Sequence, residues 1–134
     1  MTKDTHEATV WPCIRYADPH AAIDFLKKAF GFVPTVVSPS DDDMDVVHAE
    51  MRWPLGGGIM LGSVASTEGL DVNLRPGGGF VYVVTDEPDT LFDRATAAGA
   101  SEVRGLRDEE YGSRGFTVRD PEGNTWSFGT YRGE

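Results

Sequence analysis

An imidazole and a carboxylate that could share one face of a β-strand lie in one short segment of this chain. His48, Glu50 and Arg52 alternate with Ala49 and Met51, and alternate residues of a β-strand point to the same face of a sheet. An imidazole and a carboxylate on one face could act as an acid–base pair or supply two ligands to a divalent cation. A catalytic metal usually needs about three protein ligands, so this pair alone falls short of a metal centre.

The one cysteine, Cys13, is the other reactive group that the sequence offers. A single cysteine excludes an internal disulfide and any metal site built from several cysteines. No base accompanies it in the sequence, so a packed and inert thiol is the better interpretation.

Length, composition and charge limit the classes of protein to which the chain could belong. Its 134 residues are enough for one domain, and its hydrophobic fraction of 40% is typical of a globular protein. The formal charge of −10 argues against nucleic acid as a partner. The chain has no apolar leader and no apolar run of membrane-spanning length. We therefore expect a cytoplasmic protein that binds neither nucleic acid nor membrane.

Two segments with the same start and stop signals predict two helices. Asp18 and Pro19 can open the first, and Gly31 can end it. Between them, apolar residues recur with helical spacing at positions 22, 25, 26, 29 and 30. Asp86 and Gly99 bound the second segment at the same separation. The chain therefore contains an internal repeat.

Apolar and alternating segments around these helices predict strands. They cover residues 10–16, 46–53 and 59–61 in the first half, and 80–85, 101–104, 115–119 and 124–130 in the second. Asp120-Pro121-Glu122-Gly123-Asn124 is a turn sequence that closes the last hairpin. We predict an α+β protein of two tandem βαβββ modules, residues 9–64 and 80–131, joined by a linker over residues 65–79. Each module is small, so the two should share one core.

This arrangement resembles the vicinal oxygen chelate superfamily, which includes glyoxalase, bleomycin-resistance and dioxygenase proteins. The residues that carry the resemblance are Tyr16-Ala17-Asp18, Ala29 to Phe32, His48-Ala49-Glu50-Met51, Gly78 to Asp86, and Tyr111-Gly112 through Phe128. The resemblance implies that the two modules form a U-shaped half-barrel around a ligand cleft. It also implies a homodimer, because many small members complete their clefts across a dimer interface.

The enzymes of this superfamily chelate a divalent metal at four equivalent places, and the resemblance locates those places here. They are occupied by Trp11, Glu50, Phe80 and Ser127. Indole and phenyl rings cannot coordinate a metal, so the resemblance implies a protein without a metal or other cofactor. His48 and Glu50 are only weak candidates for a shifted metal site.

If the cleft exists, aromatic side chains should form its walls, with a few polar groups between them. Tyr111 and Arg114 fall in a segment that often forms a lid in this superfamily. The expected ligand-binding residues are Trp11, Cys13, His48, Glu50, Arg52, Phe80, Tyr82, Tyr111, Arg114 and Ser127. The alternative, that these aromatic residues simply fill a core, stays open.

Two functions are consistent with this reading. The first is a non-catalytic protein that binds an aromatic, antibiotic-like molecule, as bleomycin-resistance proteins do, and protects by sequestration. The acidic surface favours a cationic ligand, or simply keeps the protein in solution. The second is a glyoxalase-like lyase or isomerase, or a dioxygenase-related enzyme, that works without metal or with a degenerate metal site. In that case His48 and Glu50 would be its acid–base groups.

Overall fold

The computed structural model describes residues 8–38, 48–64 and 77–133, and these form two four-stranded sheets with two helical segments. The first sheet has the order β1-β4-β3-β2, and the second has the order β5-β8-β7-β6. In each sheet the first two strands of that order are parallel, and the other neighbours are antiparallel.

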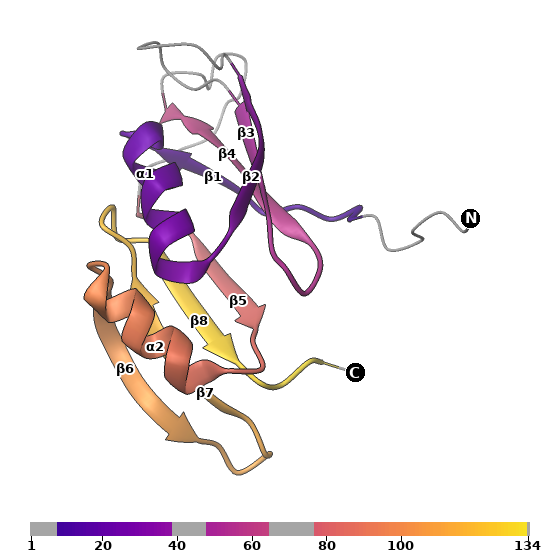
Figure 1. The fold of residues 1–134 in the computed structure, drawn as a ribbon, viewed down its shortest axis with the longest axis vertical. Helices are drawn as coiled ribbons and strands as arrows, with labels where there is room; N and C mark the ends of the chain where they lie inside the picture. The colour runs from indigo at the N-terminus through magenta and orange to yellow at the C-terminus, as the bar shows by residue number, and fades with distance from the viewer. Residues whose placement is uncertain (1–7, 39–47, 65–76, 134) are drawn as a thin grey trace.

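The first sheet contains β1 (Cys13–Tyr16), β2 (Val33–Ser38), β3 (His48–Arg52) and β4 (Gly58–Ser63). The second contains β5 (Phe80–Val84), β6 (Ser101–Asp108), β7 (Arg114–Arg119) and β8 (Thr125–Gly129). This topology confirms the prediction of an α+β fold with two βαβββ units (Figure 1).

The first helical segment begins and ends where the sequence predicts. It consists of α1 (Pro19–Phe25), which continues as the π-helix η1 (Leu26–Phe30). The Asp18 carboxylate accepts a hydrogen bond from the backbone N–H of Ala21 at 3.1 Å, which caps the first turn. Gly31 ends the segment with a φ of 93°, a conformation that glycine adopts without strain.

The second helix, α2 (Pro88–Ala97), packs beside the first (Figure 1). Arg94 on α2 donates to the carbonyl oxygens of Lys27 and Lys28, at 3.0 and 2.7 Å. These carbonyls lie in the last turn of η1, where a helix lacks internal donors, so a cation there is favourable. No helix in the described part of the chain is long and apolar enough to cross a membrane.

Three strands differ from the sequence prediction. β1 begins at Cys13, three residues after the predicted start. β2 was not predicted, because Pro34 interrupts its apolar run and because its exposed valines lack a simple two-residue alternation. β2 is an edge strand, and its register with β3 shifts between Pro34 and Val36. β6 extends to Asp108, four residues beyond the predicted end at Arg104. The predicted strand residues 46–47 and most of the predicted linker lie outside the described residues.

The two units share one hydrophobic core, as predicted. Trp126 and Phe128 of β8 point into it, and their rings lie 5.2 and 4.7 Å from the ring of Phe30 in the other unit. Phe32 then contacts both Trp126 and Trp53, at 5.6 and 4.9 Å between ring centroids. A chain of aromatic contacts therefore crosses from one sheet to the other.

A buried carboxylate, Asp120, joins the last hairpin to the first unit. Its side chain is 4% exposed and accepts hydrogen bonds from Tyr16 Oη at 2.7 Å and from Trp126 Nε1 at 3.1 Å. The backbone N–H groups of Glu122 and Asn124 donate to its other oxygen, each at 3.0 Å. Burial, and then the charge of Asp120, raise the pKa of the Tyr16 phenol well above its usual range, so its hydroxyl stays a donor.

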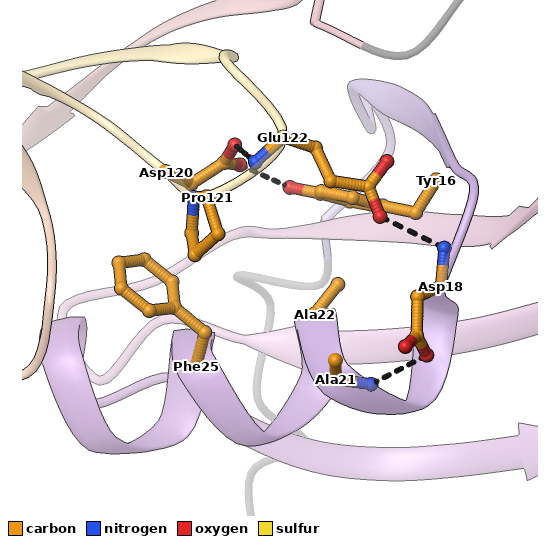
Figure 2. A pocket seen from close by; sticks show the side chains of 8 residues that line it. All are labelled: Tyr16, Asp18, Ala21, Ala22, Phe25, Asp120, Pro121 and Glu122. Atoms are coloured by element: carbon orange, nitrogen blue, oxygen red, sulfur yellow. Dashed lines mark hydrogen bonds between the residues drawn. The ribbon is translucent and has the colours of Figure 1, made fainter.

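The neighbouring Glu122 extends this connection to the start of α1. Its two carboxylate oxygens accept hydrogen bonds from the backbone N–H groups of Ala17 and Asp18, at 2.7 and 2.8 Å. Figure 2 shows both side chains of this turn reaching the first unit, Asp120 at the hydroxyl of Tyr16 and Glu122 at the backbone N–H of Asp18. The turn that the sequence identified as a hairpin therefore also positions the first helix.

We expect Asp120→Asn to destabilise the fold strongly. The asparagine amide would place an N–H group where a carboxylate oxygen now accepts hydrogen bonds. The buried donors around it would then lack an acceptor, which is costly. A loss of about 2–4 kcal/mol in the free energy of unfolding is expected, measured by urea denaturation. The control is Asp93→Asn, which removes an exposed carboxylate from α2. A loss for Asp120→Asn no greater than that of the control would contradict this role.

Candidate ligand-binding site

Each sheet has one face against the core and one face turned away from it, which we call the open face. In the first sheet, Ala49 and Met51 of β3 are buried in the core, whereas His48, Glu50 and Arg52 lie on the open face. Cys13 of β1 also lies there, as an exposed thiol. The open face of the first sheet therefore carries the only group of acid–base side chains that the sequence singled out.

The histidine and the glutamate on this face contact each other. His48 Nε2 lies 2.8 Å from Glu50 Oε2. The strand register places Met60 opposite Glu50 on one side and opposite Cys13 on the other, so a thioether separates the carboxylate from the thiol. Within residues 8–38, 48–64 and 77–133, no group of three or more His, Cys, Asp or Glu side chains could hold a metal ion. The imidazole and the carboxylate of this pair are too few to fit the divalent metal that the resemblance associates with this fold.

Trp11 is held against the open face of the first sheet by its neighbours. A Cβ atom on Gly58 would lie 2.9 Å from the indole ring, so the ring occupies space that only glycine leaves free. The guanidinium of Arg52 lies 5.2 Å from the ring centroid, a cation–π contact. The indole N–H donates to the carbonyl of Ala8 at 3.2 Å. Trp11 is half-buried rather than part of the core.

The open face of the second sheet consists of three rows of residues that run across its four strands. One row contains Tyr82, Ser127, Thr117 and Arg104, on β5, β8, β7 and β6 in turn. The row on one side contains Phe80, Thr125, Arg119 and Ser101, and the row on the other contains Val84, Gly129, Gly115 and Arg107. In each row an apolar or aromatic side chain stands on β5, a small residue on β8, and an arginine on β7 or β6.

A groove lies over two of these rows, the one that begins at Tyr82 and the one that begins at Val84. Its lining includes Tyr82, Tyr111, Thr117, Ser127, Arg104 and Arg107. Its volume is about 120 Å³, whereas clefts for drug-sized ligands usually hold about 300–1,000 Å³. The groove of one chain therefore accommodates a ring system but does not enclose a larger molecule.

Hydrogen bonds fix the polar groups of this groove. The hydroxyls of Thr117 and Ser127 lie 2.6 Å apart and share a hydrogen bond. Tyr82 Oη donates to the carbonyl of Tyr131 at 2.6 Å, and burial raises the pKa of this phenol, so Tyr82 is uncharged at neutral pH. Arg107 binds the carboxylate of Glu109 through two nitrogens, at 2.8 and 3.3 Å.

A second hollow, of about 340 Å³, shares Tyr82 with the groove. It lies between β5 and the β3–β4 turn, with walls that include Val10, Leu55 and Val81. Its charged lining residue, Arg132, is paired with Asp86 at 2.6 Å. This hollow is larger but offers few polar groups that could orient a ligand.

The structure brings some of the expected site residues together and separates others. Tyr82, Tyr111 and Ser127 line the groove. Phe80 lies one row away on the same face and is 71% exposed. The other expected residues on an open face belong to the first sheet: Trp11, Cys13, His48, Glu50 and Arg52.

Arg114 is not part of the groove. It is one of the alternate residues of β7 whose side chains face α2. Its guanidinium binds both carboxylate oxygens of Asp89, at 2.8 and 3.0 Å. A further contact of 3.3 Å joins it to Asp108. The hydrogen bond with Asp89 raises the pKa of Arg114 and lowers that of Asp89. Arg114 ties β7 to α2 and is not a lid residue in this structure.

Sequence reasoning missed the arginines of the groove. Residues three apart in a regular strand point to opposite faces, so Arg104 and Arg107 gave no sign of a shared site. The register of β6 against β7 shifts between residues 102 and 104 and again between residues 104 and 107. These irregularities place both arginines on the open face.

Comparison with known proteins agrees with this architecture. The model of the "Glyoxalase/Bleomycin resistance protein/Dioxygenase superfamily" matches residues 8–128. An uncharacterized protein of Mycobacterium bovis, Mb0911c, is 32% identical over 128 residues, which cover 92% of this chain and 83% of that protein. Among solved structures, TioX from Micromonospora sp. ML1 has a TM-score of 0.78 and 31% identity, and the match covers 93% of this chain and 99% of that one. A superfamily member from Sphaerobacter thermophilus DSM 20745 shares the fold, with a TM-score of 0.68 and 21% identity over 91% of this chain and 96% of that one.

The family match covers both sheets, both helices and the turn that carries Asp120. The chain belongs to the glyoxalase/bleomycin resistance protein/dioxygenase superfamily.

Proposed function

We propose that this protein binds a small aromatic molecule on its open faces without transforming it. The observation that carries the proposal is the groove of the second sheet, in which aromatic rings, hydroxyls and guanidinium groups converge. This mixture of flat apolar surface and a few oriented polar groups is typical of small-molecule sites. Trp11 and Phe80 add aromatic surface on the open faces.

Sequestration is the biological role that we propose for this binding. A resistance protein of this superfamily needs affinity for its antibiotic but no catalytic group, and the donor set around Glu50 does not supply a metal centre. As part of this sequestration role, we propose an antibiotic-like ligand and a cytoplasmic location. The superfamily contains enzymes as well as binders, so membership alone does not decide between these roles.

An enzymatic alternative rests on one contact. His48 Nε2 and Glu50 Oε2 are 2.8 Å apart on an open face, which is the geometry of an acid–base pair. A turnover that depends on pH and disappears in Glu50→Gln would favour this alternative, as would one tightly held divalent ion per chain. Binding that persists in Glu50→Gln, without turnover, favours the sequestration role.

The proposal includes a homodimer that encloses the site. The groove of one chain is open and small, and the edge strand β2 exposes Val33 and Val36. Exposed apolar strand edges are normally covered in stable proteins. A second copy of the chain could cover such edges and add a second wall to the cleft.

We expect sedimentation velocity at micromolar concentration to give a dimer. The expected physical cause is burial of the exposed apolar residues of the sheet edges. Val36→Lys places a charge on the edge of the first sheet and should shift the equilibrium towards monomer, whereas Lys28→Ala on η1 should not. A wild-type protein that sediments as a monomer at all concentrations up to about 100 μM, with an association free energy therefore weaker than about −5.5 kcal/mol, would contradict the dimer.

We expect Trp11→Ala to weaken a planar ligand by about 1–3 kcal/mol, the scale of losing a packed aromatic contact. The fold should be largely retained, because the indole is half-buried and lies outside the core. The measurement is a calorimetric titration with the tightest compound from a screen of planar drug-like molecules, beside thermal unfolding. Val103→Ala, which truncates an exposed side chain of β6 outside both hollows, is the control.

A Trp11→Ala protein that unfolds many degrees early, with its affinity per folded molecule unchanged, would place Trp11 in the core. That outcome would remove it from the proposed site.

A further inference from the structure

We propose that the ligand of the second-sheet groove carries an anionic group, such as a carboxylate, which Arg104 binds while the aromatic part of the ligand lies towards Tyr82. The inference rests on the proposed binding function and names the chemical class of the ligand. It reverses the preference for a cationic ligand that the charge of the whole chain suggested. A ligand meets the local charge of the groove, which is positive, whereas the net charge of the whole chain is negative.

The geometry of one row defines the length of the ligand. Arg104, Thr117, Ser127 and Tyr82 are register partners across β6, β7, β8 and β5, so their side chains share one face. Neighbouring strands are about 4.8 Å apart, so the row spans about 14 Å between its outer backbones. Side chains at both ends extend over the sheet, which leaves room for one or two fused rings with a single acidic group.

Arg104 is available for a ligand, whereas its neighbour is not. Arg107 is held by both oxygens of Glu109. Arg104 lines the same groove and makes no hydrogen bond or ion pair with any residue in the described part of the chain. A guanidinium group binds a carboxylate through two parallel hydrogen bonds, and its fixed charge does not depend on pH in the physiological range.

The floor of the groove can donate a further hydrogen bond. Thr117 and Ser127 have two hydroxyl protons between them, and their mutual contact at 2.6 Å uses one. The other proton can point into the groove. An anion above this pair would therefore meet a hydroxyl donor beside the guanidinium of Arg104.

The opposite end of the row presents a ring without a free donor. The hydroxyl of Tyr82 is committed to the carbonyl of Tyr131 at 2.6 Å. Its ring remains exposed at the groove, with the ring of Tyr111 also in the lining. An aromatic group can pack against such a surface.

No unpaired carboxylate in the described residues lines the groove to attract a cation. The acidic side chain of the lining, Glu109, is occupied by Arg107. A second arginine, Arg119, lies in the adjacent row of the same face. The groove therefore carries an excess of positive charge on a chain whose formal charge is −10, and such a local field attracts anions.

The test compares two probes of the same shape, 2-naphthoate and 2-naphthamide, by calorimetric or ligand-detected NMR titration of the full chain at low ionic strength. We expect the carboxylate to bind about tenfold more tightly than the amide, which is the scale of one charge-assisted hydrogen-bonded contact. Arg104→Gln should reduce this ratio to near unity without changing the affinity for the amide. Arg104→Lys should retain part of the ratio, because an ammonium group keeps the charge but not the two parallel donors.

Lys27→Gln is the matched control, since it removes the same charge from the exposed surface of η1. It should leave the ratio unchanged. Equal affinities of the wild-type chain for the two probes, or a ratio that survives Arg104→Gln, would overturn the inference and leave the proposed binding function standing. Tighter binding of 2-naphthylmethylammonium than of 2-naphthoate would overturn it as well. If none of the three probes binds, the proposed function itself is contradicted.

Discussion

The fold depends on a buried carboxylate. Asp120 lies in the β7–β8 turn of the second unit and accepts the hydroxyl of Tyr16 from the first, while Trp126 beside it donates from the core. A carboxylate buried without donors would be very costly, so these contacts must form together with the fold. Glu122 in the same turn accepts hydrogen bonds from the backbone N–H groups of Ala17 and Asp18, just before α1. One short turn thus fixes how the second sheet meets the first helix.

This connection holds the two units around one shared core. The side chains on the two open faces are therefore not needed to pack that core. Core positions take Trp126 and Phe128, so the residue between them, Ser127, points to the open face. The open face of the first sheet carries Trp11 and Arg52, and that of the second combines aromatic, hydroxyl and guanidinium groups. Because the core and the Asp120 turn supply the stability, these faces can vary with the ligand. This division explains how one fold can serve several chemistries in a superfamily.

Much of the architecture was predictable because local signals determine it. Asp18, Pro19 and Gly31 bound the first helix, and the alternation around Ala49 and Met51 assigns the faces of β3. The missed features are those that depend on distant partners. β2 forms against β3 in spite of Pro34, and the pairing of Arg114 with Asp89 joins residues 25 positions apart.

The groove also shows that features formed by pairing between distant segments are hard to predict from the sequence. Tyr82 and Ser127 were expected at the site, because the resemblance to the superfamily placed Ser127 and Phe80 at ligand positions and alternation puts Tyr82 on the same face as Phe80. Arg104 and Arg107 were not, because register shifts in β6 arise from its pairing with β7 and leave no mark in the spacing of residues. The net charge of the chain does not give the charge of the groove, because it also counts carboxylates that do not line the groove, such as that of Asp24 on α1.

The most direct test of the account is a map of the binding site by ¹⁵N–¹H correlation spectra of the whole chain during titration with an aromatic ligand. Binding on the open faces predicts saturable shifts at the backbone amides of Tyr82, Thr117 and Ser127, which lie on three adjacent strands. Amides around Asp120 and along α2 should keep their positions. Shifts confined to the helices, or spread evenly without saturation, would contradict the claim that the open faces form a binding site.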